Sequence, residues 1–163
     1  MSDIWVVNAS PVIALAKAGR LQLLQELCDE LLLPEAVAAE ILAGPPSDPA
    51  RQAIQGGWGT AVAAQIIPPE LLEWGLGPGE TAVLAVASER GPGTAVLDDA
   101  AARTCAKALG VPVIGTLGVV LRAKKRGFLA SAADVLKALR SAGLHLDDAV
   151  VGPALESIGE TWD

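Results

Sequence analysis

Short runs of aliphatic residues recur along the chain, and each is too short to form a helix. The clearest runs lie at residues 4–7, 31–33, 94–97 and 111–114, and residues 60–67 are expected to add an edge strand. A segment with helical start and stop signals follows most of them. Strands that alternate with helices form a mostly parallel sheet with both faces covered. The pattern therefore predicts an α/β fold, with a mostly parallel central sheet between two layers of helices.

Helix boundaries are predicted from Pro, Gly and capping residues. Ser10 before Pro11 indicates the start of a helix at 11–17, and Gly19 indicates its end. The other expected helices span 21–28, 34–43, 80–89, 100–109, 117–126, 132–142 and 147–158, with one helical turn near 51–54 and a stop at 91–93. The Pro- and Gly-rich stretch at 44–59 is interpreted as a loop, because the residues before it are too few for a separate core. A single domain over residues 1–163 is expected.

Charge and composition exclude several classes of protein. The net charge of −7 argues against a nonspecific nucleic-acid binder, although residues 103–146 carry eight basic residues and one acidic residue. The two cysteines, Cys28 and Cys105, lack the spacing of a zinc site. No apolar run reaches the roughly 18 residues that a membrane span needs, and the start of the chain lacks a basic signal-peptide region. A cytoplasmic location without membrane contact is expected.

Polar side chains follow the predicted strands where each strand ends. Asn8 follows the first strand, Asp98 and Asp99 follow the strand at 94–97, and Thr116 lies just beyond the strand at 111–114. Sites in open parallel sheets form outside the carboxyl ends of the strands, so these residues should share one edge. Glu80, in the first turn of its helix, and Glu40, on the helix after Pro34, can reach the same edge. We expect a carboxylate cluster there.

Such a cluster suits phosphodiester hydrolysis. Mg²⁺ and Mn²⁺ prefer carboxylate and water oxygens as ligands, and ions held in this way activate a water and neutralise charge on the reacting oxygens. We predict Glu80, Asp98, Asp99 and Asn8 as ligands of Mg²⁺ or Mn²⁺. Since either Asp98 or Asp99 is expected to cap the next helix, the choice of ligand between them stays open.

Four ordered motifs resemble those of PIN-domain proteins, over nearly the whole chain. They are "VVNASPVIALAKAG" at 6–19, "LPEAVAAEILAG" at 33–44, "LGPGETAVLAVA" at 76–87 and "VLDDAAARTCAKALGVPVIGTLGVVLRAKKRG" at 96–127. The sequence is most similar to an uncharacterised PIN-like branch related to VapC-type toxins of toxin–antitoxin pairs. The resemblance implies a three-layer α-β-α fold, a metal-dependent endoribonuclease, an RNA substrate, an antitoxin protein as partner and a homodimer.

The resemblance also implies which residues are catalytic. The family's acidic positions fall on Asn8, Glu40, Glu80 and Asp98 or Asp99. Asn8 departs from the pattern, because an Asp is usual there; an Asn offers an oxygen without negative charge, and metal affinity should fall. A catalytically silent PIN-like module that binds RNA or protein is therefore the alternative prediction.

Basic residues supply candidate contacts to RNA. They are Arg103 and the run formed by Arg122, Lys124, Lys125 and Arg126. The hydroxyl of Thr116 is a further candidate, as a hydrogen-bond donor to a metal ligand or to a phosphate. Each has a structural alternative: Arg103 could pair with Asp99 one helical turn away, Thr116 could cap its helix, and the run could be a solvated helix end. His145, the only histidine, is expected to be structural.

Overall fold

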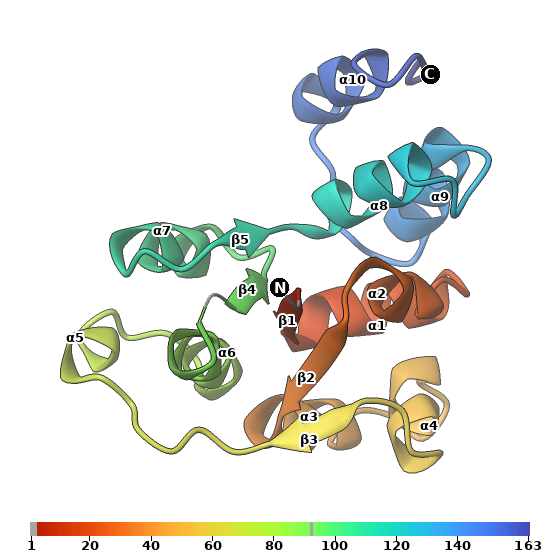
Figure 1. The fold of residues 1–163 in the computed structure, drawn as a ribbon. Coiled ribbons are helices and arrows are strands. Elements are labelled where there is room, and N and C mark those ends of the chain that lie inside the picture. The colour runs from red at the N-terminus through yellow and green to blue at the C-terminus, as the bar shows by residue number, and fades with distance from the viewer. Residues whose placement is uncertain (1–2, 92) are drawn as a thin grey trace.

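The computed structural model describes residues 3–91 and 93–163 and contains one parallel sheet (Figure 1). Its strands are β1 (Ile4–Val7), β2 (Glu30–Pro34), β3 (Thr60–Val62), β4 (Gly93–Val96) and β5 (Val113–Ile114). Every neighbouring pair is parallel, in the order β3-β2-β1-β4-β5. The predicted α/β fold with a parallel central sheet is confirmed.

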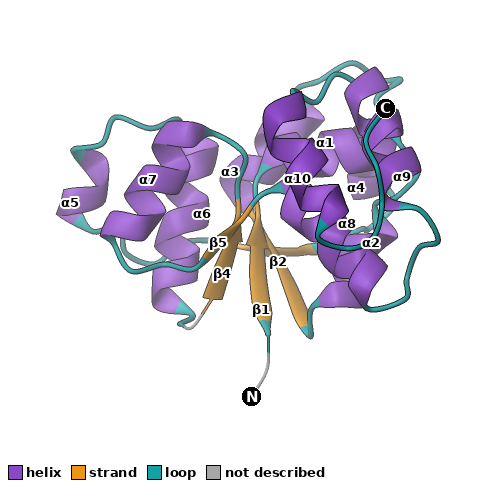
Figure 2. Cartoon of the chain, turned by 90° about the horizontal axis from the view of Figure 1, so that it is seen from above, coloured by secondary structure: helices purple, strands orange, loops and turns teal. Residues whose placement is uncertain are grey.

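Helices form a layer on each side of this sheet, which separates the two groups in Figure 2. One group holds α5 (Pro69–Leu72), α6 (Pro78–Glu89) and α7 (Ala100–Ala108). The other holds α1 (Ala9–Lys17), α2 (Gln22–Leu27), α4 (Pro49–Gln55), α8 (Thr116–Lys125), α9 (Ala132–Ser141) and α10 (Asp148–Glu156). The helix α3 (Glu35–Leu42) contacts both α1 and α6.

The strand order creates a natural binding crevice between β1 and β4. From β1 the chain proceeds outward to β2 and β3, and it then returns to the other side of β1 to form β4 and β5. The connections therefore diverge at the carboxyl ends of β1 and β4. In open α/β sheets, ligands bind at this kind of switch point. The residues that follow β1 and β4 are Asn8 and Leu97–Asp99.

The core is built from aliphatic side chains on both faces of the sheet. Val6 and Val7 of β1 are fully buried, as are Leu32 of β2 and Val96 of β4. Each such side chain contributes about 1.5–3 kcal/mol by leaving water. The buried central strands explain the continuous apolar runs in the sequence, because both faces of a parallel sheet are covered.

Several predicted boundaries need correction. The N-cap of α1 is Asn8 and not Ser10, so Pro11 is the third residue of the helix, where its missing N–H has no helical acceptor to lose. The strand expected at 60–67 ends at Val62, and α5 was not predicted. Gly19 and Gly110 end α1 and α7 with φ of 70° and 71°, as expected of glycine stops. Pro92, in the predicted stop at 91–93, lies outside the described residues.

Within residues 3–91 and 93–163, none of the helices combines the length and the apolar character that a membrane crossing requires.

Candidate active site

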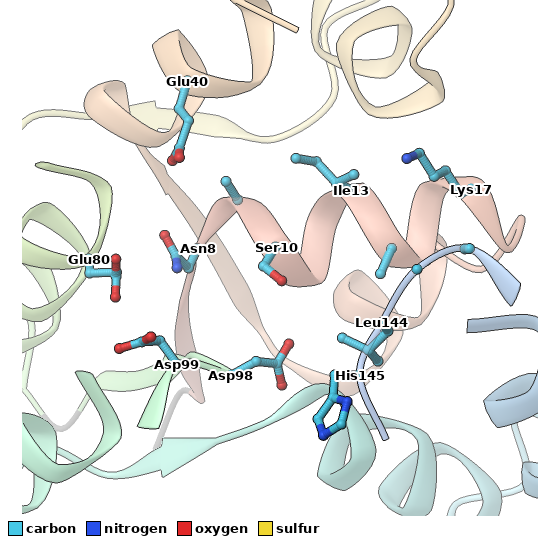
Figure 3. A pocket seen from close by; sticks show the side chains of 14 residues that line it. Asn8, Ser10, Ile13, Lys17, Glu40, Glu80, Asp98, Asp99, Leu144 and His145 are labelled. Carbon is cyan, nitrogen blue, oxygen red and sulfur yellow. The ribbon is translucent and has the colours of Figure 1, made fainter. Parts of the chain in front are cut away.

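A cavity of about 730 Å³ opens at the carboxyl edge of the sheet, beside the switch point (Figure 3). Its lining includes all of the side chains predicted to be catalytic: Asn8, Glu40, Glu80, Asp98 and Asp99. One face of α1 and the segment 142–145 complete the wall. Residues from five separate parts of the chain therefore line one cavity.

Asn8 is buried at the floor of this cavity. Its backbone N–H donates to Val96 O at 3.1 Å, which fixes the end of β1 beside β4. The side chain is 7% exposed and does not cap α1, and its Oδ1 has no hydrogen-bond partner among the described residues. A buried acceptor without a partner costs about 1–3 kcal/mol. An oxygen in this position fits a cation or a donor that enters the cavity.

Glycine at position 79 lets the Glu40 carboxylate approach this oxygen. A Cβ at Gly79 would lie 3.0 Å from Glu40 Oε2 and 3.3 Å from Asn8 Oδ1. The two oxygens therefore lie on the same side of the first turn of α6, although Glu40 comes from α3. The close approach depends on the missing side chain at position 79.

Glu80 faces other carboxylates. Burial, the negative charge of Asp99, a side-chain hydrogen bond with Asp99 and the negative charge of Glu40 raise the pKa of Glu80, in that order of size. In Figure 3 the carboxyl groups of Glu80 and Asp99 lie on the same side of Asn8, and that of Glu40 points towards Asn8 from α3. A divalent cation bound among these groups would relieve their repulsion.

The two consecutive aspartates have different partners. Asp98 accepts hydrogen bonds from Thr116 N at 2.7 Å and from Thr116 Oγ1 at 2.6 Å, so both of its oxygens are engaged. Asp99 is the N-cap of α7 and accepts from Ala102 N at 2.9 Å. The capping residue is thus also the one whose carboxylate contributes to the raised pKa of Glu80. Figure 3 shows the Asp98 carboxylate on the opposite side, towards Ser10 and His145.

In the part of the chain that the structure describes, no three His, Cys, Asp or Glu side chains converge closely enough to hold a metal ion. Both oxygens of Asp98 accept hydrogen bonds from Thr116 and are directed away from the other carboxylates. The set of donors nevertheless suits a hard divalent cation. It consists of carboxylate oxygens and the unpartnered amide oxygen of Asn8.

Of the predicted RNA contacts, Thr116 and Arg103 lie next to the cavity. Thr116 is the first residue of α8 and is completely buried against Asp98; the N-cap is Gly115. Arg103 does not form the helical pair with Asp99: its Nη1 donates to Leu97 O at 3.1 Å, and the ion pairs of the described chain are elsewhere.

The basic run at 122–126 lies at the other end of α8. Ten residues of helix span about 15 Å. The guanidinium group of Arg122 lies 5.9 Å from the ring centroid of Trp5, and that of Arg126 donates to Leu27 O at 3.1 Å. Lys125 is exposed. The structure does not bring this run to the cavity.

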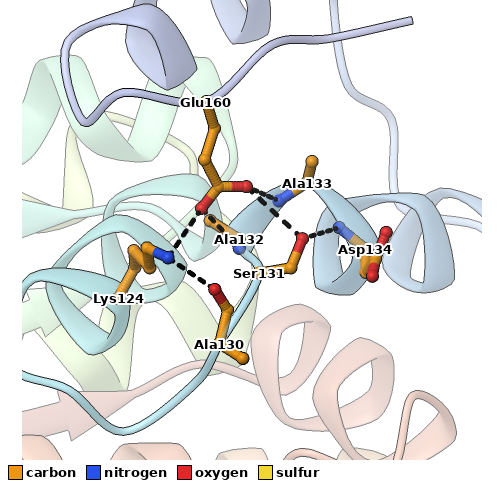
Figure 4. Close-up of polar contacts among 7 residues, drawn as sticks. All are labelled: Lys124, Ala130, Ser131, Ala132, Ala133, Asp134 and Glu160. Carbon is orange, nitrogen blue, oxygen red and sulfur yellow. Dashed lines mark hydrogen bonds and ion pairs between the residues drawn. The ribbon is translucent and has the colours of Figure 1, made fainter.

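Lys124 belongs to a polar cluster around Glu160 (Figure 4). Its Nζ lies 3.5 Å from Glu160 Oε2 and also donates to Ala130 O. Glu160 in turn accepts from the backbone N–H groups of Ala132 and Ala133, both at 2.9 Å, at the start of α9. Lys124 therefore has a structural role in this chain.

Three further polar residues line the cavity and were not predicted as site residues. Ser10 and Lys17 are seven positions apart on the face of α1 that lines the cavity, and this face could not be found from Asn8, which is the N-cap and lies outside the helix. His145 was expected to be structural, but it is exposed in the segment between α9 and α10 and faces the cavity. No local sequence signal marks that contact, because it depends on how α9 and α10 pack.

An open parallel sheet with an acidic cavity at its switch point is the architecture of a nuclease-type α/β domain. The family model of the PIN domain matches residues 4–160, and the chain belongs to this family. A search of curated proteins gave no significant match. PIN domains generally bind divalent metals, so family membership and the oxygen ligands in the cavity point to the same chemistry.

Proposed function

We propose that this protein is a metal-dependent endoribonuclease. The observation that supports the proposal most strongly is that Glu40, Glu80 and Asp99 line one cavity together with Asn8, whose buried side-chain oxygen has no partner among the described residues. A carboxyl group in a cavity whose pKa is raised by burial and by neighbouring carboxylates, as that of Glu80 is, is a candidate for a functional residue. Repulsion of this kind is a cost to the fold that cation binding would offset.

Glu80, Asp99 and Asn8 would hold Mg²⁺ or Mn²⁺, with Glu40 beside them. A bound divalent ion supplies an activated water and neutralises charge on the attacking and leaving oxygens of a phosphodiester. Asp98 was predicted as a ligand, but its two hydrogen bonds to Thr116 suit a positioning residue that fixes the start of α8. The carboxylate of Glu40 can accept the proton of an attacking water.

The first experiment is cleavage of single-stranded oligoribonucleotides with Mn²⁺ or Mg²⁺. Wild type would be compared with Glu80→Gln, Asp99→Asn and Asp98→Asn, and with Glu26→Gln on the exposed face of α2 as control. We expect metal-dependent cleavage by wild type and by the control, and its loss in the first two variants. Absence of cleavage with either metal would refute the nuclease proposal.

Asn8 favours a second candidate, a PIN-fold module that binds RNA or protein without cutting. Asn8 brings no negative charge to the site, and the carboxylates do not converge within the described residues. The variant Asn8→Asp separates the candidates. In a nuclease, the added charge should tighten Mn²⁺ binding in calorimetry and increase cleavage. Unchanged or weaker Mn²⁺ binding would remove Asn8 from the ligand set.

We further propose that the protein acts in the cytoplasm as the toxin of a toxin–antitoxin pair. An antitoxin segment with a basic side chain would inhibit by occupying the acidic cavity. A homodimer is proposed as well, and the exposed apolar side chains Ile66 and Trp74 offer a surface for it. Growth arrest on expression, relieved by Glu80→Gln, would support the toxin role; sedimentation would measure the oligomeric state.

A further inference from the structure

We propose that a second cavity, next to the acidic one, binds a nucleoside of single-stranded RNA beside the phosphate to be cut. This inference rests on the proposed nuclease function, for which it defines a substrate subsite. The second cavity measures about 400 Å³, within the range of roughly 300–1,000 Å³ typical of small-molecule sites.

The two cavities are neighbours. Asp98, Leu144 and His145 line both of them, so a strand bound at the carboxylates needs only to pass these side chains to reach the second cavity. The end of β5, the start of α8 and the start of α10 form its other walls. This position is on the β5 side of the switch point, away from β2 and β3.

The walls are mainly aliphatic. Leu117, Leu144 and Leu146 are partly exposed there, and Val150 of α10 is 55% exposed. A mostly apolar lining with a few polar groups is typical of a site for a flat organic ring. The neighbouring acidic cavity, by contrast, would hold the charged phosphate through its metal.

Two side chains of the cavity can stack on a base. His145 stands at the boundary between the cavities, and Arg103 crosses over Gly115, where a Cβ would lie 2.6 Å from Arg103 Nη1. A side chain at position 115 would force the Arg103 guanidinium group to shift from this path. His rings and Arg guanidinium planes are common stacking partners of unpaired RNA bases.

Arg103 also provides charge where RNA needs it. A phosphate approaching Glu40, Glu80, Asp98 and Asp99 is repelled by their carboxylates. The guanidinium group uses Nη1 to bond Leu97 O, and it has five N–H donors in total. Donors therefore remain for a phosphate or a base edge at the junction of the two cavities.

The test measures RNA binding without cleavage. Fluorescence anisotropy would follow labelled single-stranded hexaribonucleotides in EDTA, with Val150→Trp to fill the cavity and Leu72→Trp as control. Leu72 is 61% exposed on α5 and lines neither cavity. We expect at least tenfold weaker binding by Val150→Trp and unchanged binding by Leu72→Trp. Arg103→Lys, which keeps the charge and loses the plane, should also weaken binding.

Equal affinities of wild type and Val150→Trp would overturn the subsite, and so would no detectable binding by wild type. Cleavage assays with Mn²⁺ distinguish failure of the nucleoside subsite from failure of the proposed nuclease function. Cleavage whose base preference is unchanged in Val150→Trp would contradict the subsite and leave the nuclease intact. Binding that depends on Val150, without cleavage under any condition, would refute the nuclease and leave the subsite standing.

Discussion

Glu80 and Glu160 occupy opposite electrostatic environments in one small protein. Burial by itself would raise the pKa of Glu160, but hydrogen bonds from the N–H groups of Ala133 and Ala132, and Lys124, lower it below its ordinary value. Glu80 has burial and two further carboxylates around it, and its pKa is raised. The comparison shows that Glu160, which holds the fold, is surrounded by hydrogen-bond donors, whereas Glu80 at the cavity is surrounded by other carboxylates.

The largest expected difference between the two glutamates is in catalysis. Glu80→Gln should reduce metal-dependent RNA cleavage about 100-fold or more, because loss of a metal ligand removes several kcal/mol of transition-state stabilisation. Glu160→Gln should cleave at the wild-type rate at temperatures where it is folded. Initial rates on one oligoribonucleotide would measure both. Similar losses in the two variants would contradict the division of roles.

The second-largest expected difference between Glu80 and Glu160 is in metal binding. Mn²⁺ at 100 times its dissociation constant would stabilise wild type by about 2.7 kcal/mol. We expect Glu160→Gln to retain this stabilisation and Glu80→Gln to lose most of it. Thermal melts with Mn²⁺ and with EDTA would show the difference. A full Mn²⁺ response in Glu80→Gln would place the ion elsewhere.

Without metal, Glu160→Gln should destabilise the fold by about 1–2 kcal/mol, since the start of α9 loses its charged acceptor. The pKa of Glu160 is lowered from 4.5 in the folded state, so its stabilising effect is complete above pH 4.5 and disappears as the pH falls through the lowered pKa. Urea unfolding from pH 7 to pH 3 would follow this. A pH-independent difference would exclude the charge as the cause.

The smallest expected effect is on the stability of the metal-free protein, which Glu80→Gln should increase and Glu160→Gln should decrease. Because the folded-state pKa of Glu80 is raised above 4.5, ionised Glu80 destabilises the metal-free protein, and this penalty grows as the pH rises through the raised pKa. Glu80→Gln should therefore melt slightly higher than wild type in EDTA at pH 7 and equally below pH 4.5. A lower melting temperature at pH 7 would show that Glu80 is structurally required.

The sequence predicted the parts of the site that depend on strand ends. Asn8 and Asp98 follow buried apolar runs, and parallel strands place their carboxyl ends at one edge, so their proximity could be inferred. Glu40 and Glu80 lie on different helices, yet helix starts beside that edge brought them within reach. The central strands could also be predicted from the sequence, because burial on both faces of the sheet requires continuous aliphatic runs.

Other features depend on tertiary packing and left no local signal. Asp98 is engaged by Thr116, which lies 18 positions further along the chain, and Asp99 is the residue that caps α7. The run at 122–126 is basic in sequence, but helix α8 carries it away from the cavity and Glu160 engages Lys124. His145 reaches the cavity only through the arrangement of α9 and α10.

A substitution at Gly79 would change the space in the cavity without changing its charge. A methyl group at this position would lie 3.0 Å from the Glu40 oxygen and 3.3 Å from the Asn8 oxygen and would displace them slightly, while every ionisable group of the cavity is retained. Gly79→Ala would thus be a steric plug that leaves the net charge and the outer surface unaltered. If it still captured RNA without cutting it, it could serve as bait for recovering natural transcripts from cells.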